Sequence, residues 1–294
     1  MQTLTVNGYD IAYLDIGRGA AEAPPLVCVH GTLGDFRTWN AVLGPLSKRH
    51  RVITLSLRRF FPEHWDGVGS DYLMAQHVAD VIGFIEKLNA GPVDLMGHSR
   101  GGHISFRVAQ ARPDLLRKLV LAEPGGDLDA TLKQELATTG FTPVGARMPM
   151  AMEKIKGGDI DGALQLVVDG IDGDGTWARL PSAPKQHMRD NVLTLIGQVG
   201  ENRKPFAKSD AEQINTPTLL IGGGDTIGPL SMIWRVLAEH IPDATTAVIP
   251  ATRHWMFETA PQEYCSVVME FLAAQPLSIS DRDATRHPNR PAAD

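Results

Sequence analysis

The stretch Val93-Asp-Leu-Met-Gly-His-Ser-Arg-Gly-Gly-His-Ile-Ser105 decides how the rest of this chain is interpreted. Apolar residues lead into Gly97-His98-Ser99-Arg100-Gly101, and a helical pattern follows. This order predicts a strand, a sharp turn with Ser99 at its apex, and a helix. The glycines two residues before and after the serine remove Cβ atoms that would clash where strand and helix meet. We therefore expect a strained, projecting serine beside a helix N-terminus, which favours negative charge.

Composition describes an ordinary globular chain with a sizeable core. It has 294 residues, 43% of them hydrophobic and 21% charged, with a formal net charge of −6, which fits one large domain with an insertion, or two domains. No basic run suggests nucleic-acid binding, and no apolar run approaches the roughly 20 residues of a membrane helix. The first residues lack the pattern of a signal peptide. Cys28 and Cys265 lie in apolar runs and are expected to be buried, reduced thiols of a cytoplasmic protein.

Strand and helix patterns alternate along most of the chain. The alternation from Leu4 to Ile16 around Asn7-Gly8 predicts a β-hairpin. Six further apolar runs predict strands with helices between most of them: Leu26–Val29, Arg51–Leu57, Pro92–Met96, Lys118–Ala122, Pro217–Ile221 and Thr245–Pro250. This order predicts an α/β fold with a mostly parallel central sheet and helices on both faces. Right-handed crossovers then bring the carboxyl ends of the strands to one edge.

The alternation stops in the middle of the chain. Residues 127–214 show helical patterns and no convincing strand, so we expect a helical cap inserted into a core formed by residues 1–126 and 215–274. The insertion is long enough to cover the edge where the strands end. Residues 275–294 are polar and contain three prolines, which is typical of a disordered tail.

Three residue types needed for nucleophilic catalysis follow predicted strands. A serine hydroxyl attacks poorly until a base removes its proton, and a carboxylate on the other nitrogen of a histidine holds that base in the right tautomer. Ser99, Asp225 and His254 supply these groups in the order Ser, Asp, His. Glu123 follows another strand and is the alternative acid. The sequence shows no metal-ligand spacing and no phosphate-binding loop, so we expect neither a metal nor a cofactor.

These motifs resemble those of the α/β-hydrolase superfamily, over about residues 3–126 and 215–274. His30-Gly31 is similar to the family's oxyanion loop, Gly97–Gly101 to its nucleophile elbow, and Arg253-His254-Trp255 to its histidine loop. Asp225 lies in Gly222-x-x-Asp225-x-x-x-Pro229, which resembles the acid loop and favours Asp225 over Glu123. The resemblance implies an oxyanion hole made by the backbone N–H groups of Thr32 and Arg100. It also implies a two-step reaction through an acyl-enzyme.

Other residues are weaker candidates. Trp255 and Phe257 follow the histidine and are candidates for the substrate pocket, although one of the two should face the core. Arg189 and His187 in the cap could meet a substrate, but surface positions are the simpler interpretation. The histidines near the catalytic motifs, His30, His98 and His103, are expected to brace the surrounding structure.

A long aromatic and basic loop, residues 57–71, replaces a shorter turn of many relatives. A solvated loop with anchoring aromatics is the favoured interpretation, and an entrance or an anion-binding element is the alternative.

The sequence and the resemblance together predict a serine hydrolase that cleaves a small or medium carboxylic ester or a lactone. We expect a small-molecule substrate and a monomer or homodimer. One alternative is a carbon–carbon bond hydrolase of the meta-cleavage type, in which Arg179 or Arg189 would bind a substrate carboxylate. A cofactor-free perhydrolase is another. A non-catalytic ligand receptor on the same fold is the alternative outside enzymes.

Overall fold

The central feature of the computed structural model is an eight-stranded sheet in the order β1-β2-β4-β3-β5-β6-β7-β8. The structure describes residues 1–19, 23–133, 147–242 and 244–274. The six strands β4, β3, β5, β6, β7 and β8, which are neighbours in that order, run parallel to one another. The bounds are β1 Gln2–Val6, β2 Tyr9–Ile16, β3 Leu26–Val29, β4 Val52–Leu55, β5 Val93–His98, β6 Leu116–Ala122, β7 Thr218–Gly223 and β8 Ala244–Ile249. The predicted mostly parallel sheet is confirmed.

The predicted hairpin forms the antiparallel edge of this sheet. Strands β1 and β2 pair antiparallel around Asn7 and Gly8, whose φ angles are 51° and 73°. Two successive residues with positive φ match the twist of a two-residue hairpin turn, which explains the Asn-Gly pair. Strand β2 then pairs antiparallel with β4.

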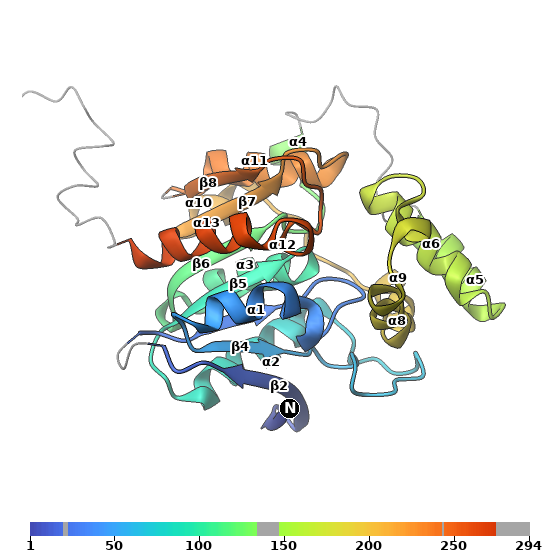
Figure 1. The fold of residues 1–294 in the computed structure, drawn as a ribbon, viewed down its shortest axis with the longest axis horizontal. Coiled ribbons are helices and arrows are strands. Elements are labelled where there is room, and N and C mark those ends of the chain that lie inside the picture. Colours follow the sequence, from blue (N-terminus) through green and yellow to red (C-terminus); the bar gives the residue numbers. More distant parts are fainter. Residues whose placement is uncertain (20–22, 134–146, 243, 275–294) are drawn as a thin grey trace, which may run out of the picture.

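Helices cover both faces of the sheet, as predicted (Figure 1). One buried cluster joins the sheet to α2, α3 and α11, and a second joins the opposite face to α1 and α13. Because both faces are covered, every residue of β3, β4, β5 and β7 is buried. The bounds are α1 Asn40–Ser47, α2 Met74–Leu88, α3 Arg100–Ala111, α11 Pro229–His240, α12 Met256–Thr259 and α13 Pro261–Ala273, with short 3-10 helices at Phe36–Trp39 and Pro113–Leu115.

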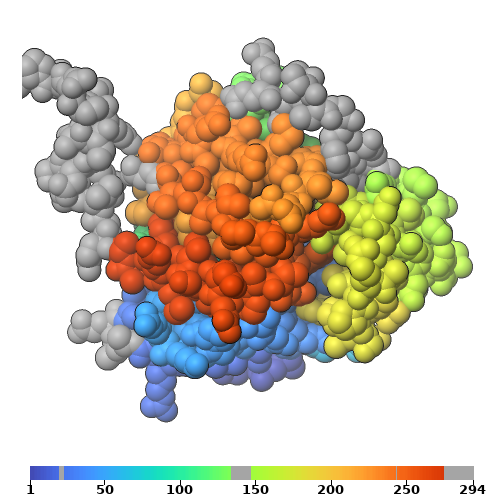
Figure 2. Space-filling view, turned by 45° about the horizontal axis from the view of Figure 1, so that its top comes forward, coloured from blue at the N-terminus to red at the C-terminus, as the bar shows by residue number. Residues whose placement is uncertain are grey.

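The described part of residues 127–214, here called the insertion, is helical apart from loops and one isolated bridge between Leu128 and Phe206. Its middle helices stand at one side of the core, in yellow-green in Figures 1 and 2. They share a third apolar cluster that includes Leu33 from the loop after β3. The bounds are α4 Ala130–Lys133, α5 Met148–Lys156, α6 Ile160–Asp172, α7 Thr176–Arg179, α8 Ser182–Asp190, α9 Thr194–Val199 and α10 Lys208–Glu212. The predicted tail, residues 275–294, lies outside the described residues.

Buried polar side chains attach the insertion to the core. Asp35, at the start of a 3-10 helix after β3, is fully buried and accepts hydrogen bonds from Arg37 and from the Asn191 amide at 2.8 Å. Arg107 on α3 pairs with Asp210 on α10 at 2.7 Å. These contacts join residues more than 100 positions apart in the chain.

The 57–71 loop packs against the insertion and pairs its own arginines. The backbone N–H of Phe61 donates to Asn191 Oδ1 at 2.8 Å, and Trp65 stacks on Tyr72 with ring centroids 5.3 Å apart. Arg58 pairs with Asp80 at 2.8 Å, and Arg59 pairs with Asp71 at 2.7 Å. The aromatics of the loop are therefore anchors, and its two arginines are already matched by carboxylates.

The two thiols are free and buried, as predicted. Burial raises the pKa of Cys28 well above its usual range and that of Cys265 to about 11, so neither is a reactive thiolate at neutral pH. None of the helices that the structure describes is long and apolar enough to cross a membrane.

Candidate active site

Ser99 occupies the turn between β5 and α3. Its backbone has φ 52° and ψ −118°, the strained conformation predicted for the apex of the turn. A Cβ atom at Gly97 would lie 2.3 Å from the carbonyl oxygen of Gly101, and one at Gly101 would lie 2.2 Å from that of Val29. Glycine is therefore required at both positions, because any side chain would force strand, helix and neighbouring loop apart.

His254 follows β8 and is almost completely buried. Its Nδ1 lies 2.8 Å from Oε2 of Glu123, and the other oxygen of that carboxylate accepts the backbone N–H of Gly223 at 2.8 Å. A carboxylate at Nδ1 keeps the proton there and leaves Nε2 available as a base. Among the described residues, no hydrogen bond joins the Ser99 hydroxyl to His254. Catalytic hydrogen bonds commonly tighten only when substrate is bound.

The prediction that Asp225 is the carboxylate partner of His254 is wrong. Asp225 is exposed, and its backbone N–H donates to the carbonyl of Thr252. Glu123, the alternative acid, is the residue that pairs with His254 Nδ1. It follows β6, which lies beside β7 in the sheet, and its positive φ of 40° turns the chain there. Both acids follow a strand in the sequence, and only the packing of the sheet shows which of the two reaches His254.

The residues expected to supply backbone donors lie beside the serine. Arg100 is the first residue of α3, so its N–H has no partner within the helix. Thr32 lies in the loop after β3, where a Cβ atom at the preceding Gly31 would be 2.9 Å from the Cβ of Ser99. Both N–H groups are thus placed near the serine, which fits the oxyanion hole implied by the resemblance.

The other histidines near the turn brace the backbone, as expected. His30 Nε2 accepts the N–H of Leu57 at 3.0 Å, and its Nδ1 lies 2.8 Å from the Gly31 carbonyl. Burial lowers the pKa of His30 to about 4, so the ring is neutral. His98 Nε2 contacts the carbonyl of His254 at 3.0 Å, and His103 Nδ1 contacts that of Gly125 at 3.1 Å. Burial also holds the pKa values of these two histidines well below the usual range.

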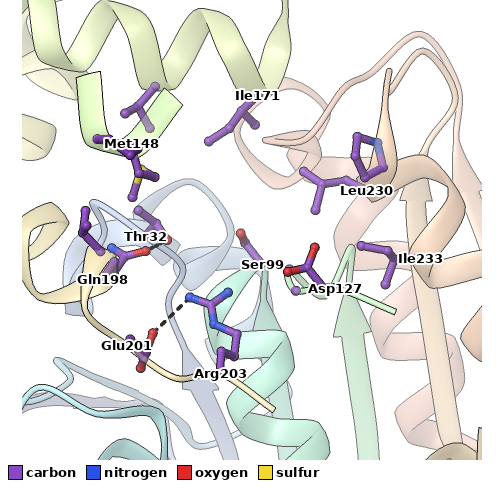
Figure 3. Close-up of a pocket in the computed structure, with 16 residues that line it drawn as sticks. Thr32, Ser99, Asp127, Met148, Ile171, Gln198, Glu201, Arg203, Leu230 and Ile233 are labelled. Atoms are coloured by element: carbon purple, nitrogen blue, oxygen red, sulfur yellow. Dashed lines mark hydrogen bonds and ion pairs between the residues drawn. The ribbon is translucent and has the colours of Figure 1, made fainter. Parts of the chain in front are cut away.

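A cavity of about 340 Å³ opens above Ser99 (Figure 3). The side chain of Ser99 points into it from the core, and helices of the insertion close it from the other side. Its apolar wall is lined by Met148, Val167, Ile171, Leu230 and Ile233. Its polar wall is lined by Thr32, Asp127, Gln198, Glu201 and Arg203.

Trp255, Phe257 and Arg189 do not line this cavity. Phe257 is completely buried in the core against Trp39 and His98. Trp255 packs between the core and the apolar cluster of the insertion. Arg189 pairs with Asp161 on the surface at 2.7 Å, and Arg179 donates hydrogen bonds to Thr176 of α7 and to the Asp174 carbonyl in the turn before it. The pocket predictions for Trp255, Phe257 and Arg189 are wrong. Closeness in sequence to His254 does not place Trp255 or Phe257 at the cavity, and helical periodicity does not say which face of the insertion meets it.

The charged groups at the polar wall were missed by the sequence interpretation. The Arg100 side chain is fully buried and makes two hydrogen bonds to Glu201, at 2.6 and 2.7 Å. Arg203 lies 3.3 Å from the same carboxylate and lines the cavity. The only signal was Glu201-Asn-Arg203 itself, a short charged stretch at the end of the helical region. Its contact with Arg100 crosses about 100 residues of chain.

A second carboxylate of the insertion touches the backbone of the histidine loop. Asp172, at the end of α6, accepts the backbone N–H of His254 at 3.0 Å, and its carbonyl accepts a hydrogen bond from the Arg253 side chain. Burial raises the pKa of Asp172. The insertion therefore contacts His254 as well as the cavity.

Comparison with known proteins agrees with this architecture. A family model described as the alpha/beta hydrolase family matches residues 26–267, and the chain belongs to that family. It is 24% identical over 274 residues to an sn-1-specific diacylglycerol lipase of Mus musculus, covering 87% of this chain and 83% of that protein. It is 25% identical over 263 residues to an (E)-2-((N-methylformamido)methylene)succinate hydrolase of Acinetobacter baylyi, covering 87% and 92%.

A solved structure shows the same fold. The enol-lactonase of Burkholderia xenovorans superposes with a TM-score of 0.72 at 20% identity, covering 93% of this chain and all of that one. The match to the alpha/beta hydrolase family, with a lipase and a second hydrolase among the relatives, makes this chain a hydrolytic enzyme.

Proposed function

We propose that this enzyme is a serine hydrolase that cleaves a carboxylic ester or lactone through an acyl-enzyme on Ser99. The observation that carries the proposal is the strained Ser99 at the floor of the cavity, on the same edge of the sheet as the buried His254–Glu123 pair. A projecting serine, a base with an oriented free nitrogen and two backbone donors are the parts that acyl transfer requires.

The proposed reaction has two steps. His254 Nε2 takes the proton of Ser99 Oγ as that oxygen attacks the carbonyl carbon, and the backbone N–H groups of Thr32 and Arg100 stabilise the oxyanion. His254 then gives the proton to the leaving alkoxide. An ester releases it as an alcohol, and a lactone keeps it as a hydroxyl group on the ring-opened acyl chain. A water molecule, deprotonated by His254, then attacks the acyl carbon. The bond from that carbon to Ser99 Oγ breaks, His254 returns the proton to Ser99 Oγ, and the carboxylic acid is released. Glu123 holds the ring and stabilises the imidazolium.

We further propose that the insertion acts as a cap that shapes the substrate site. The cavity volume of about 340 Å³ suits a small molecule, and its apolar wall comes largely from the insertion and α11. The free, buried thiols fit our proposal of a cytoplasmic location. We keep a monomer or a homodimer as the proposed assembly.

A fluorophosphonate probe tests the mechanism. The folded wild-type protein should form one covalent adduct on Ser99, detected by peptide mass spectrometry, and Ser99→Ala should form none. The variant should also lose about 10³- to 10⁶-fold in kcat toward p-nitrophenyl hexanoate, because the nucleophile is gone. A matched Ser105→Ala variant removes a serine of α3 rather than the elbow serine and should keep the label. A folded wild-type protein without an adduct would overturn the proposal.

A further inference from the structure

We infer that Arg203 is the binding group for an anionic part of the substrate, placed at the polar wall of the cavity that contains Ser99. The inference rests on the serine hydrolase proposed above and adds the class of substrate. Arg203 is the one cationic side chain among the described residues that line the cavity, and 24% of that side chain is exposed. In Figure 3 its guanidinium lies below Ser99, between Glu201 and Asp127.

The counterion beside Arg203 is already engaged. Both oxygens of Glu201 are bound by Arg100, at 2.6 and 2.7 Å, and Arg100 has no exposed surface. Arg203 reaches only one of these oxygens, at 3.3 Å, which is long for a charge-assisted hydrogen bond. Arg100 and Glu201 therefore neutralise each other as an ion pair. The positive charge of Arg203 is left largely without a counterion.

Among the described residues, Arg203 has no carboxylate partner of its own, because its one ion pair is to Glu201, which Arg100 already binds. Burial and the neighbouring Arg100 guanidinium lower the pKa of Arg203. A bound carboxylate would supply the missing charge, and the planar guanidinium suits two parallel hydrogen bonds to it. The amide nitrogen of Gln198, on the same wall, is buried and has no partner in the described part of the chain. It is a second donor on that wall.

Asp127 sets a limit on where the anion lies. Its exposed side chain faces the same cavity near Ser99 (Figure 3), and no ion pair to another described residue neutralises it. A substrate anion close to Asp127 would be repelled, so the favourable position is on the Arg203 side of the cavity. The opposite wall is apolar and suits a hydrocarbon chain. The pattern fits an ester or lactone whose acyl part carries a carboxylate some atoms away from the scissile carbonyl.

Three p-nitrophenyl esters with the same six-carbon acyl chain test this inference: the hexanoate, the adipate monoester and the 6-(trimethylammonio)hexanoate. For the wild-type enzyme, kcat/KM for the adipate monoester should exceed that for the hexanoate by about tenfold, the effect of one charge-assisted hydrogen bond. Arg203→Gln should lower this ratio at least tenfold. Asp127→Asn should raise it about two- to fivefold, because a like charge is removed.

The surface variant Arg189→Gln is the matched control and should leave both the ratio and the rates unchanged, since Arg189 lies outside the cavity. A wild-type ratio of one or less, a ratio unaffected by Arg203→Gln, or a preference for the ammonium ester would overturn the anion site. If the hexanoate is still hydrolysed and Ser99 still labelled, the serine hydrolase proposal stands. Loss of both labelling and all ester turnover in folded wild-type protein would overturn the two together.

Discussion

The edge of the sheet and the insertion both form the cavity, but they hold their residues by different means. At the edge of the sheet, Ser99 and Glu123 are placed by positive φ angles at the ends of β5 and β6, and Gly223 fixes the Glu123 carboxylate through a backbone N–H. In the insertion, Glu201 and Asp210 are placed by ion pairs to side chains of α3. The residues at the edge of the sheet therefore depend on local backbone geometry. The insertion's side of the cavity depends on contacts between distant parts of the chain.

The largest expected effect is on kcat, and it distinguishes Glu123 from Asp225, the two acids at the edge of the sheet. Glu123→Gln should lower kcat by about 10³- to 10⁴-fold, because an amide cannot hold the His254 tautomer or stabilise the imidazolium. Asp225→Asn should change kcat less than about twofold, since Asp225 is exposed and its hydrogen bond to the Thr252 carbonyl comes from its backbone N–H. Steady-state kinetics with one activated ester measures both. The reverse pattern would restore Asp225 as the acid and contradict the observed pairing.

The next effect concerns the pair that joins the insertion to the start of α3. Glu201→Gln should destabilise the protein by about 3 kcal/mol, because the buried Arg100 guanidinium loses its counter-charge. The free energy of unfolding in urea measures this loss. Glu153→Gln removes an exposed pair with Lys156 and should cost less than about 0.5 kcal/mol. Equal effects in the two variants would show that the Arg100–Glu201 pair does not stabilise the fold.

A smaller effect on the free energy of unfolding is expected at the Arg107–Asp210 contact, and it should depend on pH. Burial alone would raise the pKa of Asp210, but hydrogen bonds from Arg107, Lys204 and Gln110 outweigh it and lower the pKa to about 2. The contribution of ionised Asp210 to stability is therefore fully present above the ordinary pKa of an aspartate, and it is lost as the pH falls through about 2. Asp210→Asn should cost about 1–2 kcal/mol at pH 7, allowing for solvent screening. In urea titrations the difference from wild type should shrink between pH 5 and pH 3; a constant difference would argue against an ionised pair.

The smallest effect concerns Asp172 as a positioning residue between the insertion and the base. Asp172→Ala should lower kcat about fivefold with little change in KM, because the His254 backbone loses one hydrogen bond worth about 1 kcal/mol. Asp172→Asn keeps an acceptor oxygen and should restore most of the rate. A change confined to KM, or no rescue by asparagine, would place Asp172 in substrate binding or general stability instead.

The sequence predicted the core well because its signals are local. The Asn7-Gly8 hairpin and the six later strands appear within a few residues of their expected bounds. Ser99 was recognisable because the glycines two residues either side are demanded by contacts within a single turn and with the adjacent strand. His254 was recognisable from its place after the last strand.

The predictions that failed required knowledge of packing. Asp225 and Glu123 each follow a strand, and nothing along the chain says which carboxylate reaches Nδ1 of His254. Trp255 and Phe257 are close to His254 in sequence, yet one packs between core and insertion and the other lies inside the core. Arg189 lies on an amphipathic helix whose outer face could not be told from the face toward the cavity.

By itself, the sequence determined the alternation of strands and helices, the elbow at Ser99 and the place of His254 after the last strand. These follow from periodicity and from steric demands between near neighbours. Only the tertiary structure decided the partner of His254, the ion pair of Arg100 with Glu201, and the place of Arg203 at the cavity. Each of these depends on side chains about 80 or more positions apart, or on which face of a helix is covered. Local patterns carry no information about such contacts, because they arise only when the layers pack.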